Sequence, residues 1–274
     1  MESRLSISIV DTHCHLNFDV FDQDRNLVVD RARQNGISRI LNPGIDIETS
    51  KSALICAHTY SEVYAAVGVH PNTGLSWTKQ TLSDIRLLAG EAKVRAIGEI
   101  GLDYYRDWTP RELQQSIFKQ QLELAAELEL PVIIHTRDAT EEMLSILQEW
   151  HKILQQSGSK LSDRPGVMHS FSGDLSFAQE VVALNFKIGI TGSVTFNKSQ
   201  RLQSVVTSQP LENIFIETDA PYITPHPFRG KRNEPANVRI VAEQIAKLKD
   251  DTLDNIAKIT TAGADELFRW REIH

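Results

Sequence analysis

Short apolar runs alternate along the whole chain with amphipathic segments. Each run holds β-branched or other apolar residues at consecutive positions and is bounded by Gly, Pro, Asn or Asp. Such continuous runs predict strands that are buried on both faces, as the strands of a parallel sheet are. The runs are residues 7–11, 38–41, 63–69, 94–100, 131–135, 166–169, 187–190 and 214–217.

The segments between the runs predict helices, and residues 112–128 give the clearest signal. There we expect Thr109 to act as the N-cap and Pro110 to lie in the first turn, because these residue types favour those positions. Residues 152–166 are polar and indicate an extended loop. The other expected helices are residues 22–34, 48–58, 80–88, 140–154, 175–184, 236–248 and 254–268.

The regular alternation of strand and helix signals predicts an α/β protein with a parallel sheet. For a chain of 274 residues, the first choice is a closed (β/α)8 barrel, or TIM barrel, that forms a single domain over residues 1–274. A doubly wound open sheet is the alternative. No Gly-x-Gly-x-x-Gly turn follows the first run, which argues against a dinucleotide-binding site.

Residue types that bind metals gather where the apolar runs end. In a barrel the carboxyl ends of the strands meet at one mouth, and this is where active sites form. The sequence therefore predicts a site of four histidines and two carboxylates that are distant along the chain and close in space. The residues are His13, His15, Glu99, His135, His169 and Asp219.

Each of these residues also has a structural interpretation. His13 and His15 have strand spacing, so both can face one ion, but two polar residues at a strand end need not bind anything. Glu99 is the candidate to bridge two cations, and otherwise a salt-bridged core carboxylate. Asp219 can bind an ion and accept a proton from water, and it can also cap a turn. Cys14 should point away from the site toward the core. The equivalent placement of the whole set favours the metal site.

Composition and charge narrow the class of protein. Apolar residues make up 41% and charged residues 24%, which is typical of a globular protein. The net charge of −7 argues against coating nucleic acid by charge alone, but not against contact with DNA at a local metal site. Cys14 and Cys56 form no disulfide framework. We find neither a signal peptide nor ~18 consecutive apolar residues, and expect a cytoplasmic protein.

Two further features are candidates for contact with a substrate. His70 ends the third run and is either a substrate-contacting or a structural residue. The basic segment of residues 226–235 follows the last run and overhangs the same mouth. Its side chains can bind phosphates, although charge runs are usually solvated loops. The candidates in this segment are Arg229, Lys231, Arg232 and Asn233.

The motifs of the chain, taken in order, resemble those of the TatD family of metal-dependent deoxyribonucleases, within the amidohydrolase-like barrels. They span nearly the whole chain. Ser170 stands where many relatives have Cys, and Gly263 stands where an Asn is expected, a departure that bears on helix capping and not on chemistry. The matching segments are residues 11–16, 68–71, 98–104, 131–139, 169–173, 217–222 and 229–235.

The resemblance implies a (β/α)8 barrel that hydrolyses DNA phosphodiesters, in known members often as a 3′-to-5′ exonuclease. It also implies that the four histidines and two carboxylates named above are metal ligands. The family is usually described as Mg-dependent, whereas the histidine-rich set suits Zn or Mn better.

The leading hypothesis is a phosphodiesterase that hydrolyses DNA at single-stranded or frayed ends. It holds two divalent metal ions (Mg, Mn or Zn), with Asp219 as general base and Glu99 as the bridging ligand. DNA is the expected partner, and neither a membrane nor an obligate protein partner is expected. One alternative keeps the site but hydrolyses a small ester, lactone or amide. Another is a non-catalytic barrel that keeps metal for stability. A nucleophilic triad fits less well, because the chain has no Gly-x-Ser-x-Gly motif.

Overall fold

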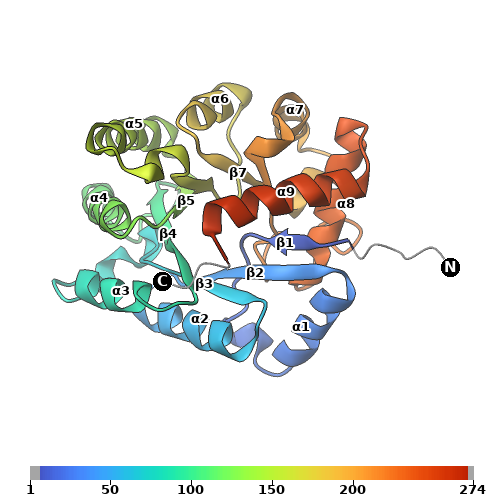
Figure 1. The fold of residues 1–274 in the computed structure, drawn as a ribbon, viewed down its shortest axis with the longest axis horizontal. Helices are drawn as coiled ribbons and strands as arrows, with labels where there is room; N and C mark the ends of the chain where they lie inside the picture. The colour runs from blue at the N-terminus through green and yellow to red at the C-terminus, as the bar shows by residue number, and fades with distance from the viewer. Residues whose placement is uncertain (1–6, 271–274) are drawn as a thin grey trace.

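The computed structural model describes residues 7–270, whose strands form one parallel sheet in the order β1 to β8 (Figure 1). Between β8 and β1 the barrel closes just beyond the strand ends, where Thr12 N donates to Ile216 O (3.2 Å) and Asp219 N donates to His13 O (2.9 Å). The expected (β/α)8 barrel is therefore confirmed. The strands are β1 Ile9–Asp11, β2 Ile37–Pro43, β3 Val63–Val67, β4 Val94–Asp103, β5 Val132–Arg137, β6 Gly166–Met168, β7 Lys187–Ile190 and β8 Ile214–Ile216.

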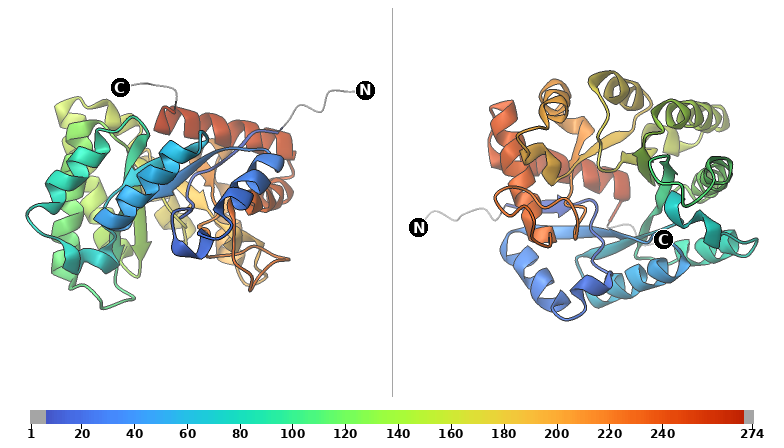
Figure 2. Two further views of the ribbon diagram at one scale, coloured as in Figure 1. Left: turned by 90° about the horizontal axis from the view of Figure 1, so that it is seen from below. Right: turned by 180° about the vertical axis from the view of Figure 1, so that it is seen from behind.

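Helices α1 to α8 surround the barrel, and α9 crosses one of its ends (Figures 1 and 2). The segment after β8 lies at the other end, as the left view of Figure 2 shows. The helices are α1 Arg25–Gln34, α2 Ile47–Thr59, α3 Thr81–Ala89, α4 Arg111–Leu128, α5 Thr140–Ser157, α6 Leu175–Ala183, α7 Gln200–Ser208, α8 Val238–Lys249 and α9 Leu253–Phe268.

Three local expectations were wrong. Helix α7 was not predicted, because its segment is mostly polar and buries only Leu202, Val205 and Val206. The expected loop over residues 152–166 is instead the end of α5 followed by a 3₁₀ turn, Lys160–Asp163. The N-cap of α4 is Pro110, not Thr109, because the helix starts at Arg111 and its first backbone hydrogen bond runs from Gln114 N to Pro110 O (3.0 Å).

Alternate residues of the strands fill the interior of the barrel. One buried cluster takes a residue from each of seven strands, together with the C-terminal end of α9. Since side chains two apart in a strand share a face, the next inward residues are His135 within β5, His169 directly after β6 and Glu217 directly after β8. In β7 the inward position is Gly189, whose absent Cβ would lie 2.4 Å from Glu217 Oε2. The interior residues are Val10, Leu41, Ala66, Ala96, Ile133, Val167 and Phe215.

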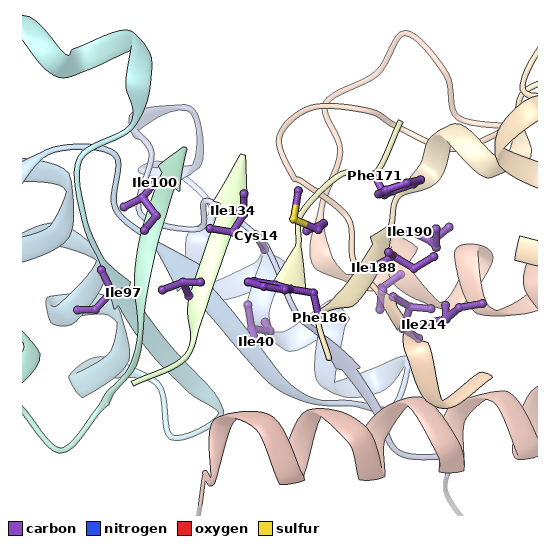
Figure 3. Packing of buried hydrophobic residues seen from close by; sticks show 14 of the residues in the cluster. Cys14, Ile40, Ile97, Ile100, Ile134, Phe171, Phe186, Ile188, Ile190 and Ile214 are labelled. Carbon is purple, nitrogen blue, oxygen red and sulfur yellow. The ribbon is translucent and has the colours of Figure 1, made fainter. Parts of the chain in front are cut away.

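The opposite faces of the strands pack against the surrounding helices and form the larger core (Figure 3). Cys14 is fully buried within this larger core, as the strand spacing predicted (Figure 3). Burying a large apolar side chain of this core, such as Ile40 or Phe186, stabilises the fold by about 1.5–3 kcal/mol. This layer holds the strands in register and so fixes where their carboxyl ends lie.

The described helices do not include one with the length and the apolar composition that crossing a bilayer requires. Residues 1–6, which formed part of the argument against a signal peptide, lie outside the described residues.

Candidate metal centre

The side chains predicted as metal ligands lie together at the carboxyl end of the strands. His13 and His15 follow β1, Glu99 lies within β4, and His135 lies within β5. His169 follows directly on β6, and Asp219 comes three residues after β8. The six side chains therefore converge at one end of the barrel, as the sequence predicted. Glu99 and three of the histidines are buried, and His135 and Asp219 are largely buried.

Glu99 stands at the centre of the cluster. Its Oε2 lies 3.5 Å from Nε2 of both His13 and His15. Its Oε1 lies 3.1 Å from His135 Nδ1 and 3.9 Å from His169 Nε2. The two oxygens of one carboxylate thus face different histidines, so Glu99 has the geometry to contact more than one ion.

Glu99 reaches this position because strand β4 runs very close to β5. A Cβ on Gly101 would lie 2.0 Å from His135 O, and the residue has φ +142°, which side chains rarely adopt. A Cβ on Gly98 would lie 2.6 Å from Ile133 Cβ. The glycines that flank Glu99 are therefore required by the approach of the two strands.

Asp219 faces the same histidines from the other side. Its Oδ1 lies 3.7 Å from Nε2 of His15 and of His169, and 3.9 Å from His13 Nε2. The residue has φ +54°, an uncommon conformation that costs energy and often marks functional sites. Its backbone O also accepts a bond from Tyr222 N (2.8 Å), so Asp219 combines the predicted turn role with a place in the cluster.

Oxygen atoms lie behind the histidines and orient their rings. His15 Nδ1 faces Pro43 O at 3.2 Å, and His135 Nε2 lies 3.3 Å from Asp103 Oδ2. His169 Nδ1 lies 2.8 Å from Glu217 Oε1. In the neutral form of each ring the proton belongs on the nitrogen that faces this oxygen, which leaves a lone pair on the nitrogen that faces the cluster, as in metal-binding histidines.

His70 has the opposite arrangement. Its Nδ1 accepts a hydrogen bond from Asn72 N (3.0 Å), so the ring proton belongs on Nε2, which lies 3.5 Å from Glu99 Oε1. Burial, together with His135, lowers the pKa of His70 to about 3, so the ring is neutral. His70 could complete a group with Glu99 and His135 on distance alone, but its assigned tautomer favours a hydrogen-bond donor.

The charges of the cluster follow from burial and from its neighbours. Burial, reinforced by His169, holds the pKa of His13 well below its usual range. Burial opposes charge on His169, but Glu217 and Asp219 outweigh it and raise its pKa to about 10. Burial also raises the pKa of Asp219 to about 6. The pKa of Glu99 is well below its usual range, because the histidines outweigh its burial.

These residues fit divalent metal ions. Ligand atoms of three groups lie within 4.8 Å of one another: His13, His15 and Asp219; His13, Glu99 and His169; and His70, Glu99 and His135. Nε2 of His13 and Nε2 of His15 are 3.1 Å apart, and two nitrogen lone pairs at that distance repel unless a proton or a cation lies between them. Imidazole and carboxylate donors together suit Zn and Mn.

A cavity of about 580 Å³ opens over the cluster. Of the candidate substrate residues, His70 lines it. Arg229 and Lys231 are exposed in the segment after β8 but do not line it, and each lies over an aromatic ring, Phe196 and Phe228 respectively.

Arg232 and Asn233 are held by contacts within the protein. Arg232 makes two hydrogen bonds to the carboxylate of Asp24, at 2.9 and 2.7 Å. Asn233 is fully buried, and its Nδ2 donates to Thr218 O (3.0 Å) and Tyr222 O (2.7 Å). The geometry gives these two residues the role of fixing the segment that follows β8.

Sequence reasoning missed several residues of this region. Asp103 and Glu217 stand behind His135 and His169, and Arg106 and Arg137 line the cavity. A usable signal existed for Glu217, because an acid that directly follows a buried apolar run needs a partner. The arginines carry no such signal, because Arg106 is an exposed loop residue and Arg137 is an exposed residue at the end of β5.

Fold and site together define a barrel hydrolase of the metal-dependent kind. The family model described as "TatD related DNase" matches residues 10–269. The chain belongs to this family and is a metal-dependent hydrolase.

Individual relatives are similar to this chain over nearly its whole length. An uncharacterized metal-dependent hydrolase, YabD of Bacillus subtilis, is 43% identical, with 95% of this chain and 99% of that protein covered. The 3′-5′ ssDNA/RNA exonuclease TatD of Cronobacter sakazakii is 35% identical, with 90% and 93% covered. The crystal structure of YjjV, a TatD homologue from Escherichia coli, superposes with a TM-score of 0.88 at 32% identity and covers 97% of this chain and 99% of its own.

Proposed function

We propose that this protein is a phosphodiesterase that uses two divalent metal ions to remove nucleotides from the 3′ end of single-stranded DNA. The observation that carries the proposal is the position of Glu99, whose two carboxylate oxygens face separate groups of histidines. The relative from Cronobacter sakazakii, named a 3′-5′ ssDNA/RNA exonuclease, supports nucleic acid as substrate and the polarity.

The ligands in this proposal are the six predicted residues. His13, His15 and Asp219 would hold one ion, His135 and His169 the other, and Glu99 both. Ions bound there supply an activated water and neutralise charge on the phosphate.

Two side chains of the cluster have the proton chemistry that the reaction needs. In the metal-free protein burial raises the pKa of Asp219 to about 6, and its carboxylate would accept a proton from the attacking water. His70 carries its proton on Nε2 beside the cluster and can donate a hydrogen bond to a phosphate oxygen. Replacing Asp219 removes the proton acceptor, so Asp219→Asn should lower kcat by about 10²–10⁴-fold.

The direct test uses single-stranded DNA labelled at its 5′ end in one sample and at its 3′ end in another. With Mg²⁺ or Mn²⁺, the 5′-labelled strand should shorten stepwise, whereas the 3′ label should appear at once as mononucleotide. Chelator-treated protein should be inactive and regain activity when metal is restored. Absence of cleavage in protein shown to be loaded with metal would refute the proposal.

A panel of chromogenic esters, lactones and amides, run beside the DNA, addresses the alternative substrate class. The same metal site could hydrolyse such compounds, because barrels of this kind host many reactions. Turnover of one of them at a kcat/KM above that for DNA would transfer the assignment to that class.

A further inference from the structure

Two groups of arginines stand out among residues 7–270. One group pairs with carboxylates, and its members are Arg25, Arg31, Arg33, Arg39, Arg86, Arg201, Arg232 and Arg239. Members of the other group have no carboxylate within ion-pair distance among residues 7–270 and lie instead over aromatic rings. They are Arg106, Arg111, Arg137 and Arg229.

Two members of the second group line the cavity over the metal ligands. Arg106 Cζ lies 4.4 Å from the ring centroid of Trp108, and Arg137 Cζ lies 3.7 Å from that of Tyr105. Arg137 ends β5 and pairs in register with Asp103 at the end of β4, and Arg106 follows Asp103 by three residues. A guanidinium held over an aromatic ring, with no carboxylate partner, still has N–H groups that can bind a phosphate through two hydrogen bonds.

Aromatic surface is exposed at the same cavity. Trp108 and Tyr222 both line it and are 56% and 55% exposed. They extend from segments after β4 and β8, which lie on opposite sides of an eight-stranded barrel. Bases of single strands stack on such rings without regard to sequence.

We propose that Tyr105, Arg106, Trp108 and Arg137 form a subsite, the cation–aromatic rim, for the nucleotide next to the scissile phosphate. The phosphate of this nucleotide binds Arg106 and Arg137, and its base stacks on Trp108. The inference rests on the proposed function, because it needs a polynucleotide as substrate. It also moves the phosphate contact nearest the reaction from Arg229 and Lys231 to residues that line the cavity.

The rim explains how an acidic protein can bind a polyanion. The net charge is −7, yet the two cations over the metal ligands are not neutralised by carboxylates of the described chain. Glu99, Asp103 and Asp219 line the same cavity, so bound metal ions and these two arginines together would supply the local positive charge that attracts a polyanion.

The test compares two substrates in the metal-loaded enzyme. Oligo-dT has a flanking nucleotide, whereas bis(p-nitrophenyl) phosphate has none. Arg106→Ala and Arg137→Ala should each raise KM for oligo-dT about tenfold with little change in kcat. The kcat/KM for oligo-dT divided by the kcat/KM for bis(p-nitrophenyl) phosphate should fall by a similar factor. Trp108→Ala should act in the same way, and Trp108→Phe, which keeps a ring, should retain most of the wild-type ratio.

Arg201→Ala provides the charge-matched control, because Arg201 is exposed on α7 and lies outside the cavity. It should behave as wild type with both substrates. An unchanged KM for oligo-dT in Arg106→Ala and Arg137→Ala would overturn the proposal, and so would an equal loss on both substrates, which would mean that the arginines act on the metal centre.

A binding measurement separates this inference from the proposed function. Fluorescence anisotropy of labelled oligo-dT is recorded with metal-loaded Asp219→Asn, alone and combined with Arg106→Ala or Arg137→Ala. About tenfold weaker binding in the combined variants supports the rim even if the wild type cleaves no DNA. Equal binding, or no binding by any variant, overturns it. The combined variants should also bind oligo-rU about tenfold more weakly than Asp219→Asn alone, because the rim contacts the phosphate and the base and not the sugar.

Discussion

The acids behind the ligands determine what the histidines can do. Glu217 is fully buried and holds three groups at once: His169 Nδ1 at 2.8 Å, Ser170 N at 2.6 Å and Thr12 Oγ1 at 3.2 Å. It contacts no predicted substrate position and acts through His169. Its role is therefore to position a ligand and to increase the basicity of that ligand.

This role predicts the effect of Glu217→Gln. An amide of equal size removes the charge and can offer only one oxygen, so the ring of His169 loses part of its orientation. Metal affinity, measured by titration calorimetry at one fixed pH, should fall about 10–100-fold. Glu212→Gln, at an exposed acid shortly before β8, is the matched control. Equal metal affinity in the two variants would contradict the positioning role.

Metal affinity should also depend on pH in a defined direction. In the metal-free protein the pKa of His169 is raised to about 10, since Glu217 and Asp219 outweigh burial, so the ring holds a proton at neutral pH. A metal ion must displace that proton, because only the unprotonated nitrogen binds it. Affinity should therefore rise as pH rises, by about tenfold per unit for one displaced proton.

Mn²⁺ titrations at several pH values between about 6 and 8 check this direction, and proton release into weak buffer on metal addition checks its cause. Affinity that stays constant or falls with rising pH would show that His169 is neutral before metal binds.

At the scale of the elements, most of the fold was predictable because each strand is a short, continuous apolar run with a clear boundary. The ligand positions were predictable for the same reason: the strand ends are visible in the sequence, and barrel geometry brings them together. The interior spacing even places His135 and His169 two residues beyond Ile133 and Val167 of the buried layer.

The residues that escaped prediction are those whose partners come from other strands. Asp103 supports a histidine of the neighbouring β5, and Glu217 supports one that follows β6. Such pairings depend on the register of the strands and on inward orientation, which a single sequence does not display. Arg106 escaped for a related reason, since an exposed loop cation looks the same whether or not a cavity lies beneath it.

Strand β4 offers a test of how tightly the site is built into the sheet. In Gly101→Ala the new Cβ would lie 2.0 Å from His135 O at φ +142°, so β4 must move away from β5. We expect a loss of about 2–4 kcal/mol in the free energy of unfolding, together with weakened metal binding, because Glu99 and His135 separate. Urea denaturation and metal titration measure the two effects.

Gly158→Ala is the control for backbone conformation alone. Gly158 has φ +69° at the end of α5, with nothing within 4 Å of the added Cβ. It should cost only about 1 kcal/mol and leave metal binding unchanged. An equal cost in both variants would mean that the close approach of β4 and β5 is not what requires Gly101.

In the whole molecule, chemistry and stability occupy opposite ends of the barrel. The cluster lies at the carboxyl ends of the strands, and the end of α9 packs beneath the interior layer at the other. Gly263 contributes to the packing of α9 against the barrel. It lies inside α9, and a Cβ there would approach Phe215 Cε1 to 3.1 Å. The expected link between Gly263 and helix capping was therefore wrong, since Gly263 allows α9 to approach the barrel.

This separation predicts that the base of the barrel can be weakened without loss of the site. Phe268 is buried at 2% exposure beneath the interior layer and contacts the rings of Phe215 and Trp270, at centroid distances of 6.0 and 4.7 Å. Phe268→Ala leaves a cavity there and should lower the free energy of unfolding by about 3–5 kcal/mol in urea denaturation. Leu87→Ala, at a side chain 77% exposed on α3, should cost little.

Below the unfolding transition, Phe268→Ala should bind metal and turn over substrate as the wild type does, because the buried layer between α9 and the cluster remains packed. A variant that stays folded but loses metal affinity would show that the base of the barrel sets the spacing of the strand ends. The two ends of the barrel would then be coupled through the interior residues. The most direct connection runs along the chain from Phe215 in β8 to Glu217, which directly follows β8 and contacts His169.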